Sequence, residues 1–161
     1  LLEFYQQRVS DYLVGEVYTF THIFYDAQKD SMEAAALRAS VLLSENPDIP
    51  FEDASRYGDR YPFLQNYVER TRDFVSNNFS DEFVAELDTL SLGTPKWVGP
   101  IASRYGQHLV LLTRRTSARV PLLGEIRNRV LDDYHYESQV RKRREAEATV
   151  VADYEVILDL Q

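Results

Sequence analysis

Two histidines in strand-like runs are the side chains of this sequence best suited to chemistry. His22 falls within YTFTHIFY, and His108 opens the apolar run that follows Gly106. Imidazole both donates and accepts hydrogen bonds, so two histidines on neighbouring strands can form a hydrogen-bonded pair. The alternative is that each is a core histidine whose hydrogen bonds are satisfied by its own surroundings.

Composition disfavours several other kinds of site. The chain has no cysteine, which excludes disulfides and thiolate catalysis. Its three histidines lack the spacing of metal ligands, so we expect no metal and no cofactor. It has no glycine-rich phosphate loop and no nucleophile elbow. The net charge of −8, concentrated in residues 1–100, argues against a nucleic-acid groove and mildly favours basic or neutral polypeptide partners.

Two of three predicted strands carry the two histidines. In residues 16–25 the side chains alternate, and the face that we expect to point into the core holds Tyr18, Phe20, His22 and Phe24. Residues 97–102 and 107–115 are predicted to form an antiparallel pair that turns through Ser103–Gly106. Gly106 would supply the permissive backbone angle of that turn.

Helices are predicted between these strands and at both ends of the chain. The internal segments are 31–45, capped by Ser31 or Asp30, a short turn at 51–55, then 64–78 and 80–90. The flanks are a helix over 1–13 and a long helix from Pro121 to about residue 148. The pattern predicts an α+β protein whose body spans 16–116, between flanks at 1–15 and 117–161.

The last residues, Thr149–Leu160, are predicted to form a terminal strand. One face of this segment is apolar and the other is mostly acidic, as in a strand that covers a core on one side. An unpaired apolar strand promotes aggregation, so we expect this strand to pair and the N-terminal helix to pack near it.

The ordered set of segments over 16–116 resembles the parvulin-type peptidyl-prolyl cis-trans isomerases. The resemblance rests on Thr21-His22-Ile23, on the helix SDEFVAELDTL followed by Leu92-Gly93, on Gly99-Pro100 and on Gly106-Gln107-His108. It implies an antiparallel sheet with a helical insert. The two flanks look like those of bacterial cell-envelope members, which implies the periplasm or cell envelope as the location. Because the sequence opens at Leu1 without an initiator Met, we expect a fragment, and a membrane anchor could lie outside it.

The same resemblance implies roles for individual residues. Counting back from Gly93 places Phe83 on the phenylalanine of the family's proline pocket and Phe79 on a position usually held by Met or another large apolar residue. Ser103 falls on the family's Ser/Thr near the second histidine. His22, His108 and Ser103 would then form a hydrogen-bonded group that fixes the shape and polarity of the pocket. We expect Phe83 to be partly exposed in a cleft with Phe79, although helical spacing alone would also suit core residues.

The loop at 55–63 is shorter than its counterpart in the family and leaves Asp59 open to more than one interpretation. Asp59 matches either the catalytic carboxylate or the Asp of the family's Gly-Asp pair, in which case the catalytic Cys or Asp is absent. It could equally be an ordinary loop carboxylate. The loop Asp26–Asp30 has no cluster of Lys and Arg, so no phosphate specificity is expected.

The resemblance implies a peptidyl-prolyl cis-trans isomerase that acts on X-Pro bonds of unfolded or extended polypeptides. The alternative is a catalytically impaired domain of the same fold that binds extended polypeptide as a chaperone. The short loop favours the alternative, whereas the two histidines and two phenylalanines favour the enzyme.

Overall fold

A four-stranded antiparallel sheet in the order β2-β1-β4-β3 organises residues 15–118. The strands are β1 (Val17–Asp26), β2 (Asn66–Thr71), β3 (Trp97–Ala102) and β4 (Gly106–Thr116). The two central strands, β1 and β4, pair from Val17↔Thr116 to Asp26↔Gly106. The structure is a computed structural model that describes residues 1–158; residues 15–118 form one unit and the rest of the chain forms a second.

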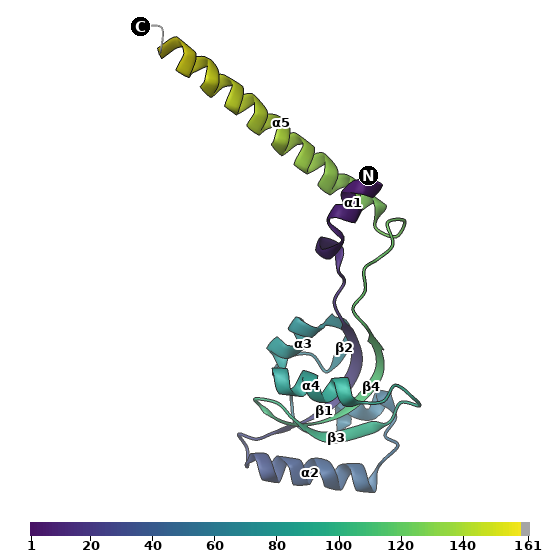
Figure 1. Cartoon of the computed structure of the whole chain (residues 1–161). Helices are drawn as coiled ribbons and strands as arrows, with labels where there is room; N and C mark the ends of the chain where they lie inside the picture. Colours follow the sequence, from purple (N-terminus) through teal and green to yellow (C-terminus); the bar gives the residue numbers. More distant parts are fainter. Residues whose placement is uncertain (159–161) are drawn as a thin grey trace. The chain divides into compact units, whose positions relative to one another are not determined.

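Helices cover both faces of the sheet (Figure 1). On one face α2 (Met32–Glu45) packs Ala35 and Ala39 against Ile23 and Leu109, and Ser31 caps the helix by accepting a hydrogen bond from the backbone of Ala34. On the other face lie α3 (Arg72–Asn78) and α4 (Asp81–Thr89). The predicted aromatic face of β1 is confirmed as a core face, because all four of its side chains are buried: Tyr18, Phe20, His22 and Phe24.

The prediction of a helix over 64–78 is wrong in its first half. Residues 66–71 form the edge strand β2, and only α3 is helical. β2 pairs with β1 through contacts such as Phe20↔Tyr67, whose rings stack with centroids 4.7 Å apart. Only Tyr67 of β2 is buried, so the segment lacks the alternation that marks a strand, and pairing with a distant part of the chain decides its conformation. The helix at 80–90, the turn at 51–55 and the hairpin were predicted correctly, as α4, η2 (Phe51–Arg56) and β3–β4.

The second unit combines the N-terminal residues with a long helix, α5 (Arg127–Leu158). The predicted helix over 1–13 is divided into α1 (Leu2–Gln7) and the 3-10 helix η1 (Val9–Tyr12). Both short helices pack against the first turns of α5. Phe4 meets Tyr134 edge-on, and Tyr12 donates a hydrogen bond to Asp133 over 3.0 Å. Arg8 also pairs with Glu137.

The prediction of a terminal strand over Thr149–Leu160 is wrong, because α5 continues through Leu158; Asp159 and Leu160 lie outside the described residues. Extending an existing helix adds a hydrogen bond for each residue that is ordered, whereas a strand needs a partner edge. The described contacts of α1 and η1 are with residues 121–141, so the expected packing of the N-terminal helix on a terminal strand is also not found. None of the helices in the described part of the chain is both long enough and apolar enough to span a membrane.

Gly106 is required at the start of β4 for a reason that differs from the predicted one. Its backbone angle is not in the left-handed region, which among the glycines holds only Gly58 and Gly99. A Cβ at position 106 would instead lie 2.1 Å from the carbonyl oxygen of Tyr25 and 2.9 Å from the backbone nitrogen of Ala27. The close approach of β1 and β4 therefore excludes a side chain here.

We expect Gly106→Ala to destabilise the sheet unit by roughly 1–3 kcal/mol or more, because both clashing atoms belong to the backbone. Urea unfolding followed by the fluorescence of Trp97, the only tryptophan, measures the effect in this unit. Gly93→Ala is the matched control, since a Cβ there meets nothing within 4 Å, and it should stay within about 1 kcal/mol of the wild type. Equal stability of the two variants would contradict the steric argument.

Candidate active site

His22 and His108 face each other across the two central strands, as predicted. β1 and β4 pair Phe24 with His108 and His22 with Val110, so the two histidines are diagonal neighbours on one face of the sheet. Their Nδ1 atoms are 3.0 Å apart, and both side chains are buried. The prediction that they lie on adjacent antiparallel strands within hydrogen-bonding distance is therefore confirmed.

The remaining ring nitrogens determine which atoms carry protons. Nε2 of His22 lies 2.9 Å from the carbonyl oxygen of Leu64, which can only accept, so this nitrogen must donate. In a neutral His22 the Nδ1 atom then accepts from Nδ1–H of His108. Nε2 of His108 in turn accepts from the hydroxyl of Ser103, 2.7 Å away. A single direction of donation, from Ser103 through His108 and His22 to Leu64, thus satisfies every nitrogen with both rings neutral.

Burial favours this neutral state. It lowers the pKa of His22 to about 4, against the smaller opposing effect of the hydrogen bond to Leu64. Burial also lowers the pKa of His108 well below its usual value, and repulsion from a charged His22 adds to this. Protonation of His22 at Nδ1 would place two N–H groups opposite each other over 3.0 Å, which also favours the uncharged pair.

Phe79 and Phe83 lie over the histidine pair and stack on each other, with centroids 4.1 Å apart and planes 11° apart. Both rings also meet His108 edge-on. Local chain geometry places them, because Phe79 ends α3 and Ser80 caps α4 by accepting from the backbone of Phe83. The expectation that Phe83 is partly exposed in a cleft is wrong: both side chains are 0% exposed.

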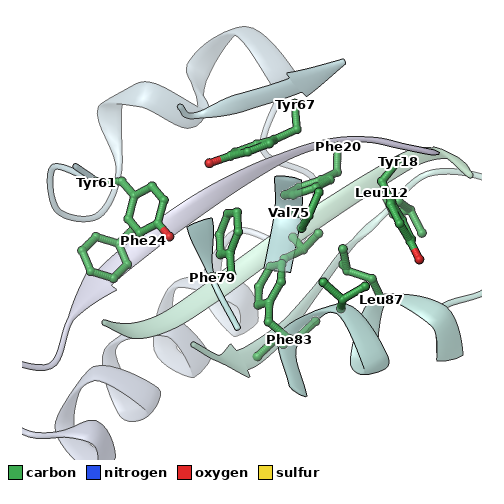
Figure 2. Packing of buried hydrophobic residues seen from close by; sticks show 13 residues of the cluster. Tyr18, Phe20, Phe24, Tyr61, Tyr67, Val75, Phe79, Phe83, Leu87 and Leu112 are labelled. Atoms are coloured by element: carbon green, nitrogen blue, oxygen red, sulfur yellow. The ribbon is translucent and has the colours of Figure 1, made fainter. Parts of the chain in front are cut away.

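The ring of Tyr61 covers this group, and it is the residue of the site that sequence reasoning missed. It stacks on Phe79 with centroids 5.1 Å apart and meets His22 edge-on at 4.8 Å and His108 at 5.3 Å. Figure 2 shows it beside Phe24, on the same side of the sheet as Phe79. Its hydroxyl donates to the carbonyl of Asn78, and burial raises the pKa of that hydroxyl. A lone tyrosine in a loop carries no periodic signal, so the sequence gives no reason to place it here.

The carboxylate of Asp59 forms its hydrogen bonds with groups other than the two histidines. Its carboxylate accepts from Lys29 over 2.7 Å, from Arg38 over 3.0 Å and from the backbone of Asp26 over 2.9 Å. Partial burial alone would raise the pKa of this carboxyl, but the hydrogen bonds from Arg38 and Lys29 outweigh it and hold the pKa well below its usual range. None of its described hydrogen bonds reaches His22 or His108. This geometry suits a carboxylate that anchors the loop.

Two pockets lie near the site, and Tyr61 lines the smaller of them. One, of about 370 Å³, is lined by residues that include His22, Gly58 and Phe63. The other, of about 600 Å³, is lined by Phe24, Asp26, Gln28, Arg60, Pro62 and Tyr105. Within the described residues no three His, Asp or Glu side chains are grouped as ligands for a metal ion. The side chains that line these two pockets are therefore partly aromatic and partly polar.

Comparison with known proteins identifies the fold but not a family. No protein-family model and no curated protein sequence matches the chain. Among solved structures, one similar chain comes from work on PEB4 and Cj1289, described as SurA-like chaperones of Campylobacter jejuni. The TM-score is 0.52 at 13% identity, over 94% of this chain and 60% of that one. PrsA from Bacillus subtilis gives a TM-score of 0.42 at 15% identity, over 82% and 44%.

The fold is thus α+β and parvulin-like, with an antiparallel sheet and a long C-terminal helix, like that of the SurA-like chaperones. At 13% identity this likeness concerns the fold alone. The chain spans 60% of the length of the SurA-like chain and less than half of PrsA.

The buried histidine pair predicts a specific dependence of stability on pH. Both pKa values are lowered on folding, so between pH 6.5 and 5 the unfolded chain binds protons that the folded chain does not, and stability falls as the pH falls. The expected loss is on the order of 1 kcal/mol per pH unit for each histidine. Carboxylates contribute little in this window, because it lies above their unfolded pKa values.

Urea unfolding monitored by Trp97 fluorescence at pH 7, 6 and 5 measures this loss. His22→Gln should reduce the slope by about half, whereas His135→Gln, which removes an exposed histidine on α5, should leave it unchanged. An unaltered slope in His22→Gln would show that the pair is not the source of the pH dependence.

Proposed function

We propose that residues 15–118 bind X-Pro segments of unfolded polypeptides and catalyse their cis-trans isomerisation. The observation that carries the proposal is the hydrogen-bonded chain of Ser103, His108, His22 and Leu64 beneath two stacked phenylalanine rings. A parvulin-like fold supports the same assignment.

The chemistry requires no covalent intermediate. Rotation about a peptide bond crosses a barrier of roughly 18–20 kcal/mol, which arises from the charge-separated resonance form of the amide. An aromatic, water-poor site disfavours that form and so lowers the barrier. Phe79 and Phe83 would supply apolar surface to the substrate pocket, and the neutral histidine pair would fix the shape and polarity of its base. No proton transfer is needed, which agrees with the low pKa of both imidazoles.

A second candidate is binding of extended polypeptide without catalysis, as in a chaperone. The full burial of Phe79 and Phe83 favours it, because a substrate cannot contact these two side chains in this structure. The hydrogen bonds of Asp59 with Lys29 and Arg38 favour this second candidate as well.

For either activity the partner would be unfolded, proline-containing polypeptide. The likeness to proteins described as SurA-like chaperones, one of them periplasmic, supports a location in the bacterial cell envelope.

Exchange spectroscopy on a proline-containing tetrapeptide distinguishes the two candidates, since it measures cis-trans interconversion without a protease. The wild type should accelerate the interconversion. Ser103→Ala, which leaves a buried nitrogen of His108 without its donor, should lower kcat/KM by about tenfold. Ser44→Ala, which removes an exposed hydroxyl from α2, is the control and should have no effect.

A protein that fails to accelerate exchange but suppresses aggregation of an unfolded client would support the chaperone instead. If neither activity is observed, both candidate functions are wrong.

A further inference from the structure

Tyr61 has the environment of a bound ligand rather than that of an ordinary core residue. Its ring contacts other aromatic rings on several sides, among them Phe79 in a stacked geometry and His22, His108 and Phe24 edge-on. The hydroxyl reaches a backbone acceptor, the carbonyl of Asn78. The space enclosed by these groups, here called the slot, thus matches both the flat faces and the hydroxyl of a phenol.

The segment that carries Tyr61 has no regular structure. Residues 60–65 contain no helix or strand, and four neighbours of Tyr61 are exposed: Arg60, Pro62, Phe63 and Leu64. Hydrogen bonds hold both ends of the segment to the sheet: the backbone of Asp59 donates to Phe24 at one end, and His22 donates to Leu64 and Gln65 at the other. Between these attachments the ring of Tyr61 is the only side chain that is buried. The pocket of about 370 Å³, which Tyr61 itself lines, leaves space next to this residue, and the pocket of about 600 Å³ is lined by its neighbours Arg60 and Pro62.

Tyr61 is followed directly by Pro62, which lines the larger pocket together with Phe24, Arg60 and Tyr105. The chain therefore presents its own aromatic-proline pair at the site, with the aromatic ring in the deep slot and the proline at the mouth. A substrate with the same pair could repeat these contacts once Tyr61 has left.

We propose that Tyr61 is an intramolecular occupant of the peptide site, and that the ligand which displaces it is an aromatic residue followed by proline in an extended polypeptide. The proposal rests on the proposed function, because it assumes that the site binds polypeptide. It accounts for part of the burial of Phe79, whose ring is stacked on the tethered ring in the unliganded protein.

A tethered occupant lowers the apparent affinity for a ligand in proportion to the fraction of molecules in which it has left the site. Weakening the tether must therefore tighten binding. Tyr61→Phe keeps the ring but removes the hydrogen bond to Asn78, and we expect the apparent Kd to fall by about three- to tenfold. Tyr61→Gly removes the ring and should lower the Kd by more than about tenfold.

The test uses fluorescence anisotropy with a labelled peptide that contains Tyr-Pro. Ala-Pro and Tyr-Ala peptides of the same length are the comparisons. We expect the Tyr-Pro peptide to bind Tyr61→Gly about tenfold more tightly than the other two, because only it supplies both the phenol and the ring at the mouth. Tyr67→Phe is the matched control: it also removes a buried hydroxyl that contacts Asn78, but from strand β2, and it should leave the apparent Kd unchanged.

A second measurement does not depend on whether Tyr61→Gly folds. 3-Fluorotyrosine placed at position 61 of the otherwise wild-type chain reports the environment of the ring by fluorine NMR. Saturation with the Tyr-Pro peptide should shift the signal to that of a solvent-exposed tyrosine.

Two results overturn the proposal in different ways. If the peptide binds while the fluorine signal stays buried, or if wild type and Tyr61→Phe bind equally, Tyr61 is a permanent part of the core and the proposed function stands without it. If no peptide binds to any variant that retains the native Trp97 fluorescence, the proposed peptide site is wrong as well.

Discussion

The hydrogen bond between the Nδ1 atoms of His22 and His108 is the constraint around which the sheet unit is built. Two imidazoles in a nearly dry interior cost free energy unless each nitrogen has a partner. Here both rings are satisfied, and the described residues contain no buried side-chain nitrogen or oxygen without a hydrogen bond. The pair joins the central strands through their side chains and, through Leu64 and Ser103, joins them to a loop and a turn.

This polar centre is enclosed almost entirely by aromatic rings. Phe20, Phe24, Phe79 and Phe83 lie around it, and Tyr61 lies over it. The low polarity of these surroundings strengthens the hydrogen bonds of the network and at the same time keeps it uncharged. The neutral histidine pair on one side and the aromatic rings on the other would form a site in which an amide is poorly solvated. This is the physical basis that the two candidate functions share.

The parts of this arrangement that depend on local sequence were predictable. Alternation places His22 on the core face of β1, and Ser31, one of the two predicted caps, does cap α2. The pairing of His22 with His108 followed from the family resemblance together with alternation.

The parts that depend on distant contacts were not predictable. β2 is a strand because β1 pairs with it. Residues 149–158 are helical as the continuation of α5, so the strand-like pattern of their own sequence does not decide their conformation. The burial of Phe83 was missed because groups from distant parts of the chain, among them Phe20 and His108, lie against its ring.

The order of the two units along the chain has a consequence for how the protein is made. Residues 15–118 are continuous, so they can fold as soon as they have left the ribosome. The residues of α1 and η1 are synthesised before the sheet unit, whereas the groups that they contact, from Pro121 to Glu137, are synthesised after it. During synthesis α1 and η1 therefore lack their partner until the whole sheet unit has been made. Because the sheet unit interrupts the second unit along the chain, vectorial synthesis delays assembly of the second unit until residues 15–118 are complete.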